Sequence, residues 1–168
     1  MERLALYYPV IPHIVNRPWG VEDTAYEELG FSRHNGIDLA LVTGQPIYAP
    51  FECRVSKIGN EPNGSGLYVC LLSRRRHGFD DGLTSRVETT FMHLSEVHTT
   101  VGAKLSVGDV LGLGGQTGRA TGSHTHMAPK RVRMNHFRGY RDRDRNEASN
   151  TFDPEPYWNG LPAMRQVP

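Results

Sequence analysis

The stretch that most constrains how this chain folds is a glycine-rich segment, residues 114–127, which closes on His124-Thr125-His126. If the chain is extended after Gly122, its side chains alternate, so both imidazoles lie on one face of a strand and Thr125 lies on the other. Two neighbouring imidazoles most commonly bind a metal ion. The pair is a weak pattern by itself, because two solvated histidines at a strand end would produce it as well.

Most of the chain between residues 37 and 127 has the pattern of short β-strands. Alternating or apolar runs predict strands at residues 37–41, 47–49, 53–58, 67–72 and 87–92. Turn-forming residues at 60–66 join two of these runs as a hairpin, and the closely spaced glycines of 101–114 suit tight turns between further short strands. The predicted fold class is therefore mostly β, with few short helices.

Three other segments carry weaker patterns. Residues 4–8 predict a short strand, and residues 23–29 predict one or two helical turns capped by Asp23. Residues 73–86 are polar and carry charges of both signs, so we expect a solvated loop there.

Length and composition indicate one ordinary globular domain. A chain of 168 residues is long enough to bury a core without disulfide staples, and 38% hydrophobic and 22% charged residues are typical of such domains. No apolar run approaches the ~20 residues needed to span a bilayer. The net charge of +1 favours no particular partner. The arginine-rich segment 131–145 is interrupted by acids, so it does not predict nucleic-acid binding; contact with anionic polymers or a solvated tail suits it equally.

The chain contains two cysteines, Cys53 and Cys70, which are too few for a disulfide framework and fit no metal motif. Both fall in predicted strands on either side of the 60–66 turn. We expect two reduced, inaccessible thiols on neighbouring strands. If they face each other across the hairpin, a strained bridge between them is the alternative.

A second candidate site lies far upstream, where His34 and Asp38 are separated by four positions. Four extended residues span about 13 Å, so the two side chains can share one ion only if the chain bends between them. Asn35-Gly36 is well suited to a bend because both residues tolerate positive φ. With one histidine of the later pair they would form a His, Asp, His set, which with an open position is typical of catalytic zinc. A surface histidine and an ordinary turn aspartate are the alternatives.

These motifs, taken together, resemble the lysostaphin-type peptidases of family M23, zinc endopeptidases that cut the peptide part of bacterial peptidoglycan. The resemblance spans roughly residues 17–133 with its elements in order. It rests on His34-x-Gly36-x-Asp38, Gly44-x-Pro46-x-Tyr48-Ala49, Met92-His93-Leu94, Val101-Gly102, Gly108-Asp109, Gly115-x-Thr117-Gly118 and Gly122-x-His124-x-His126, with a closing Phe152-Asp153-Pro154. The joint occurrence of both metal motifs and the central His-Leu is specific.

The resemblance implies one Zn²⁺ per chain, bound by His34, Asp38 and His126. It implies that His93 and His124 are the catalytic pair that handles protons and the developing oxyanion. No glutamate follows either histidine of the His-x-His pair as in a His-Glu-x-x-His enzyme, so the general base is a histidine. Which of the two acts as the base stays open.

The resemblance also implies an architecture of antiparallel sheets that form a substrate groove. We expect a single peptidase domain over residues 1–168, with core motifs at 31–133, an N-terminal lead-in at 1–30 and a C-terminal extension at 134–168 that packs back on the domain. The chain departs from the family pattern at Phe91-Met92, at Met127-Ala128-Pro129, in the 60–66 hairpin and in the long 74–86 segment. We expect these departures to line the groove and to affect which bond is cut.

The predicted function is therefore zinc-dependent hydrolysis of peptidoglycan crosslinks or stem peptides. A non-catalytic wall-binding or assembly module with the same fold is the main alternative, although such relatives typically lose ligands. A biotinyl or lipoyl carrier domain fits poorly, because neither Lys57 nor Lys104 is placed at a hairpin tip between apolar flanks.

The N-terminus, residues 1–12, has an acid at its second position and prolines where a signal peptide has an apolar run. With no signal peptide of its own, the protein is expected to stay in the cytoplasm until released. It would then reach the wall through lysis, or as part of a larger assembly such as a virion. A phage lysin or a virion-borne protein, with other virion or lysis proteins as partners, fits that route.

Overall fold

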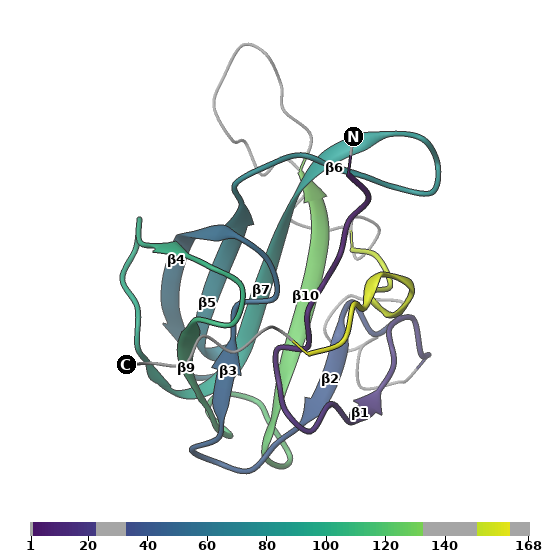
Figure 1. Cartoon of the computed structure of the whole chain (residues 1–168). Helices are drawn as coiled ribbons and strands as arrows, with labels where there is room; N and C mark the ends of the chain where they lie inside the picture. The colour runs from purple at the N-terminus through teal and green to yellow at the C-terminus, as the bar shows by residue number, and fades with distance from the viewer. Residues whose placement is uncertain (1, 23–32, 133–150, 162–168) are drawn as a thin grey trace.

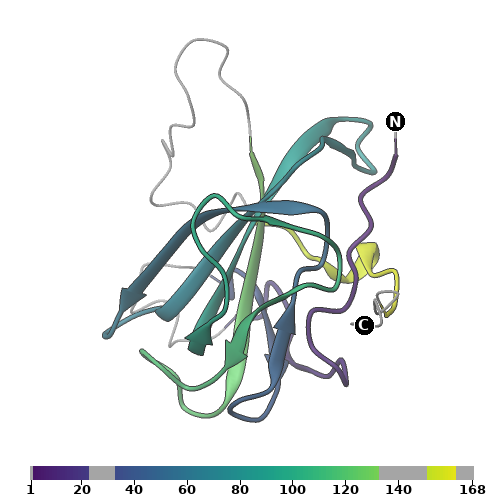
Figure 2. The same ribbon diagram turned by 60° about the vertical axis from the view of Figure 1, so that its left-hand side comes forward.

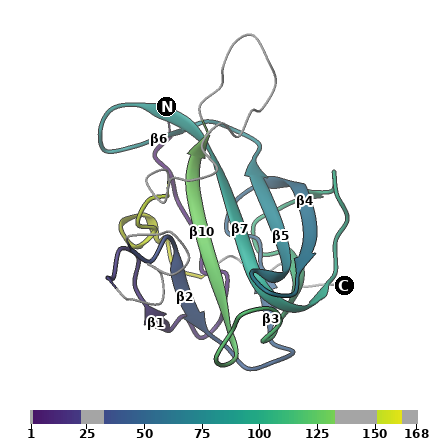
Figure 3. The same ribbon diagram turned by 180° about the vertical axis from the view of Figure 1, so that it is seen from behind.

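The computed structural model describes residues 2–22, 33–132 and 151–161, and these form an antiparallel β structure. The elements are β1 (Val15–Arg17), β2 (Ile37–Ala40), β3 (Pro46–Tyr48), β4 (Cys53–Glu61), β5 (Gly66–Ser73), β6 (His77–Gly78), β7 (Thr84–Val97), β8 (Lys104–Leu105), β9 (Val110–Gly114), β10 (His124–Val132) and the short 3₁₀ helix η2 (Glu155–Tyr157). The main sheet has the order β1-β2-β10-β7-β5-β4-β8, and β3 pairs with β9, which also pairs with the end of β7. Opposite views show β10, β7, β5 and β4 side by side, with β2 on the other flank of β10 (Figures 1 and 3).

The predicted mostly-β class is confirmed, as is the hairpin of β4 and β5. Residues 4–8 form only isolated contacts, such as the bridge from Leu6 to Trp158, and not a continuous strand. The expected solvated loop at 73–86 includes β6, which pairs with the start of β7. The helical turns expected at 23–29 lie outside the described residues. Within the described part of the chain, no helix is long and apolar enough to cross a membrane.

The main sheet buries one face of its central strands. Residues opposite each other on paired strands point to the same face, and the registers place Met127 opposite both Ile37 and Phe91. Phe91 in turn lies opposite Val69, and all four side chains are fully buried. Because side chains alternate along a strand, Asp38 and His126 lie on the other face of β2 and β10.

The N-terminal and C-terminal segments pack together beside the sheet. The backbone of Leu6 pairs with Tyr157 and Asn159, at N···O distances of 2.8 and 2.7 Å. Figure 2 shows the purple N-terminal segment running alongside the yellow segment that contains η2. Tyr157 and Leu6 are both buried and belong to the apolar core.

Strand β7 contains a bulge at the position of His93. Between the pairs Leu67–Leu94 and Val69–Phe91, β7 advances by three residues while β5 advances by two. This extra residue lets Phe91 and Leu94 both remain fully buried. His93 has a backbone φ of 65° within the bulge, a conformation that residues other than glycine seldom adopt. The strand was predicted to end near this point, but it continues to Val97.

Both cysteines are free and buried, on the neighbouring strands β4 and β5. They do not face each other: Cys53 lies opposite Ser73, whereas Cys70 lies opposite Lys57. The face-to-face arrangement considered from the sequence is therefore wrong, because the strands pair in a register that separates the two thiols. Burial raises the pKa of Cys53 to about 12 and also raises the pKa of Cys70.

We expect Ellman's reagent to label neither thiol readily at pH 8 in the native protein, because both are buried and protonated at that pH. After denaturation without reductant, both thiols should react. The variants Cys53→Ser and Cys70→Ser assign the signal to one thiol or the other. In the native protein Cys70, the slightly more exposed of the two, should react first. A count below two free thiols after denaturation would contradict the expectation.

Candidate metal centre and active site

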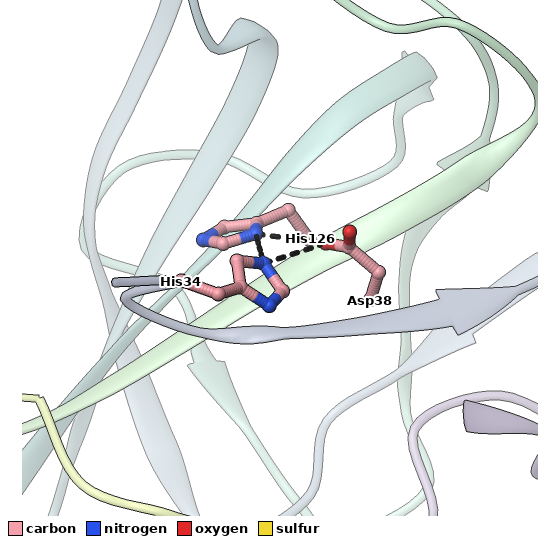
Figure 4. Close-up of side chains that lie close together, drawn as sticks. All are labelled: His34, Asp38 and His126. Carbon is pink, nitrogen blue, oxygen red and sulfur yellow. Dashed lines mark hydrogen bonds and ion pairs between the residues drawn. The ribbon is translucent and has the colours of Figure 1, made fainter. Parts of the chain in front are cut away.

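Three side chains converge on the face of the sheet opposite the core. His126 Nδ1 lies 2.9 Å from Asp38 Oδ1 and 3.0 Å from His34 Nε2, and His34 Nε2 lies 3.2 Å from Asp38 Oδ1. Figure 4 shows the three side chains pointing toward one another from β10, β2 and the loop that precedes β2. All three are buried. They are the predicted metal ligands, and the structure brings them together.

Strand pairing and a tight loop produce this convergence. Asp38 and His126 lie directly opposite each other in the β2–β10 ladder, so both point to one face. His34 is held in the preceding loop by backbone hydrogen bonds in both directions, from Gly20 N to His34 O and from His34 N to Val21 O, each 2.9 Å long.

The loop bends between His34 and Asp38, although not by the backbone conformation expected from the sequence. Neither Asn35 nor Gly36 has positive φ, so that expectation is wrong. Gly36 is required for a different reason: a Cβ at this position would lie 2.5 Å from Nε2 of His126 and 2.6 Å from the carbonyl oxygen of Met127. The loop crosses β10 too closely for any side chain.

The donor atoms fit a tetrahedral zinc ion. Ligand atoms bound at ~2.0–2.1 Å in a tetrahedron lie about 3.3 Å from one another, and the three observed separations are close to this value. His34 Nδ1 lies 2.8 Å from the carbonyl oxygen of Pro18. A carbonyl only accepts, so Nδ1 carries the proton of the neutral ring and Nε2 presents a lone pair. That lone pair then faces a carboxylate oxygen at 3.2 Å, an arrangement that a cation between them would stabilise.

The electrostatics of the cluster favour ligands in their metal-binding protonation states. Burial raises the pKa of Asp38, but the adjoining imidazoles of His126 and His34 outweigh that effect and hold the pKa well below its usual range. Burial lowers the pKa of His126, against the opposing attraction of Asp38. A carboxylate and a neutral imidazole are the forms that bind zinc.

Two further histidines lie beside this cluster. The rings of His93 and His124 are 4.8 Å apart at their centroids, and His124 Nε2 lies 3.9 Å from Asp38 Oδ1. Each Nδ1 is 2.8 Å from a backbone carbonyl oxygen, that of Thr117 for His93 and that of Gly122 for His124. Both rings in their neutral form therefore keep the proton on Nδ1 and leave a lone pair on Nε2.

His93 is suited to accept a proton near neutral pH. Burial lowers the pKa of His93. The hydrogen bond to the Thr117 carbonyl opposes this shift, and the neighbouring His124 adds to it. The ring is thus neutral at pH 7, with Nε2 available as a base. Two of the histidines outside the motifs lie away from this site: His13 stacks on Tyr8, and His98 pairs with Glu96 at the surface.

Comparison with known proteins decides the family. The model of "Peptidase family M23" matches residues 32–136, which is more than half of the chain. The chain belongs to this family.

Several of the relatives and structures similar to this M23 chain are named as peptidases. An uncharacterized metalloprotease of Haemophilus influenzae is 34% identical over 55% of this chain and 18% of its own length. Peptidoglycan DD-endopeptidase ShyA of Vibrio cholerae is 37% identical over 55% of this chain and 19% of its own length. The chain thus spans about a fifth of these curated relatives. The catalytic domain of lysostaphin from Staphylococcus simulans superposes with a TM-score of 0.64 at 22% identity, over 87% of this chain and 92% of that one, and so shares its fold.

The departures from the M23 pattern do not all lie at the site. Phe91 and Met127 are fully buried in the core, so the expectation that they line a groove is wrong. The 74–86 segment was also expected there, but β6 pairs with the start of β7, beside the Val132 end of β10. His124 begins the same strand at its opposite end, and Figure 1 shows β6 beside the arrowhead end of β10. The six residue-to-residue steps from His126 to Val132 span about 20 Å of extended strand. Of these departures, the 60–66 hairpin does lie beside the site, because Ser65 O accepts a hydrogen bond from His93 N.

Sequence reasoning missed the backbone groups that orient the histidines of this M23 site. The carbonyls of Pro18, Thr117 and Gly122 each accept a hydrogen bond from an imidazole. Main-chain acceptors have no side-chain signature in a sequence. Thr117 stood in a motif, but only the structure shows what its carbonyl contacts.

Proposed function

We propose that this M23 domain is a zinc-dependent endopeptidase that hydrolyses the peptide part of bacterial peptidoglycan. The observation that carries the proposal is the triangle of donor atoms from His34, Asp38 and His126, with two more imidazoles beside it whose Nε2 atoms keep their lone pairs. The names of the similar proteins support the substrate, since they include a peptidoglycan DD-endopeptidase and lysostaphin.

His34 Nε2, Asp38 Oδ1 and His126 Nδ1 would hold the zinc ion. Bound zinc supplies a Lewis acid for the scissile carbonyl and lowers the pKa of its water toward neutrality. Two neutral imidazoles and one carboxylate leave net positive charge at the centre. Pro18 O fixes the ring of His34, and the lowered pKa of Asp38 keeps it a carboxylate, so the ligand set is formed before substrate arrives.

His93 and His124 carry the proton chemistry. Their Nδ1–H groups are held by backbone carbonyls, so each ring accepts a proton at Nε2 and becomes an imidazolium without losing its anchor. One ring takes the proton of the attacking water, and an imidazolium returns a proton to the leaving amine. An imidazolium also stabilises the negative charge that develops on the carbonyl oxygen.

The experiment combines zinc analysis with digestion of two kinds of peptidoglycan. We expect one zinc per chain in protein purified without chelators, loss of activity on chelation, and recovery on adding zinc. Walls with glycyl bridges and walls with direct diaminopimelate crosslinks should be digested separately, and mass spectrometry of the fragments identifies the bond cut. Bound zinc with no fragments from either wall would favour the non-catalytic wall-binding module instead. Protein that neither contains nor takes up zinc would contradict the metal site itself.

The route to the wall is proposed separately from the chemistry. We propose release by lysis or transport in a virion, with other virion or lysis proteins as partners.

A further inference from the structure

Thr117 lies where the glycine-rich loop, the β4–β5 hairpin and the bulge of β7 meet. Its carbonyl oxygen accepts the hydrogen bond from His93 Nδ1 at 2.8 Å. That bond sets which nitrogen of His93 carries the proton, and so leaves the lone pair on Nε2. The position of the Thr117 carbonyl therefore determines whether His93 presents a base to the site.

The hydroxyl of the same residue holds that carbonyl in place. Thr117 Oγ1 accepts a hydrogen bond from Leu67 N at 2.9 Å and donates one to Leu94 O at 2.7 Å. Leu67 and Leu94 lie opposite each other in the β5–β7 ladder, at the edge of the bulge. The hydroxyl thus bridges the two strands at the residue that follows His93, and it ties the loop to them.

The surroundings leave the loop little freedom to shift. A Cβ on Gly66 would lie 2.4 Å from the backbone of Thr117, and a Cβ on Gly118 would lie 2.3 Å from Gly66 N. Arg119 N donates to Gly64 O at 2.8 Å on the same side. The loop and the hairpin are in direct backbone contact, so the threonine side chain is anchored between two strands and cannot turn away.

We propose that Thr117 is the positioning residue of His93: its hydroxyl fixes the loop on the β5–β7 ladder, and its carbonyl fixes the imidazole. This assignment rests on the endopeptidase function proposed above. Thr117 touches neither the three metal ligands nor a reacting atom, and it acts through His93.

The test compares Thr117→Val with Thr117→Ser in the zinc-loaded protein. Valine keeps the shape of the side chain but removes both bridging hydrogen bonds, whereas serine keeps the hydroxyl. We expect Thr117→Val to lower kcat by roughly 10–100-fold, the range typical for residues that orient an active-site group, with KM and zinc content unchanged. Thr117→Ser should restore most of kcat.

A matched control is available on β7. Thr89 is fully buried, and its hydroxyl has no hydrogen-bond partner in the described structure. Thr89→Val makes the same chemical change in the same sheet without touching His93, so its activity should equal that of the unmodified protein.

Two further measurements separate positioning from general stability. In a double-mutant cycle with His93→Ala, adding Thr117→Val should cause little further loss, because the threonine acts only through that ring. In ¹⁵N-histidine NMR spectra, His93 should show protonated Nδ1 in the unmodified protein and mixed tautomers in Thr117→Val. The His93 signals are assigned by their absence in the His93→Ala spectrum.

Additive losses in the cycle, or an unchanged His93 tautomer in Thr117→Val, would overturn the proposal. So would full kcat in the valine variant. If the unmodified protein fails to cleave any peptidoglycan, the proposed function fails, whereas the tautomer measurement still decides whether Thr117 positions His93.

Discussion

Alanine at His126 is expected to remove zinc and activity together, whereas alanine at His124 is expected to leave zinc bound and lower turnover by roughly 10²–10⁴-fold, as for a lost acid–base group. The two histidines are two positions apart on β10 and face the same side, but their distances differ. His126 Nδ1 lies within 3.0 Å of both other donor atoms, whereas His124 Nε2 is 3.9 Å from Asp38 Oδ1. A ligand keeps its lone pair on the metal, while a proton carrier must gain and lose a proton.

Zinc content by mass spectrometry and turnover of peptidoglycan are measured for both variants side by side. His98→Ala is the matched control, because that imidazole is exposed and contacts Glu96 rather than the site; it should retain zinc and full activity. Loss of zinc in the His124 variant with retention in the His126 variant would reverse the two assignments. If both variants keep zinc and full activity, the zinc-peptidase function is wrong.

Much of the sheet could be predicted because several of its strands are apolar runs or alternate between apolar and polar residues. Residues 37–41 and 67–72 carry enough consecutive apolar or alternating positions to identify β2 and β5. The strands β1 (Val-Asn-Arg) and β6 (His-Gly) contain at most one apolar residue each, so no apolar or alternating run marks them. The sequence also did not predict that β7 continues through His93. The bulge adds one residue, which shifts the apolar–polar alternation by one position, so the strand pattern breaks although the strand continues.

The candidate metal ligands could be named from motifs, but the reasons for their geometry could not. Asp38 and His126 meet through a register between β2 and β10 that no local pattern specifies. The same holds for Cys53 and Cys70, whose separation follows from the register of β4 and β5. Registers and carbonyl contacts depend on the whole fold, so a single sequence leaves them open.

Gly36 illustrates the difference, and it leads to the second large effect. We expect Gly36→Ala to lower zinc affinity by about 10–100-fold, comparable to the loss of a group that orients a ligand. The new Cβ would lie 2.5 Å from His126 Nε2, 2.6 Å from His126 Cε1 and 2.6 Å from Met127 O. Met127 lies in the middle of the sheet, paired with Phe91 and Ile37, so its carbonyl cannot move away. The loop that carries His34 or the ring of His126 must shift instead, and either movement breaks the triangle of donor atoms.

Zinc affinity is measured by competition with a chromophoric chelator, and folding by thermal unfolding in the presence of excess zinc. Gly78→Ala is the control: it lies in β6 at the far end of β7, and its nearest neighbour to an added Cβ is 3.6 Å away. That variant should bind zinc like the unmodified protein. Since Gly36 has ordinary φ, backbone strain cannot explain a loss at this position. Unchanged zinc affinity in Gly36→Ala would therefore show that the loop can move away from β10 without disturbing His34, and that the close crossing is not what sets the ligand geometry.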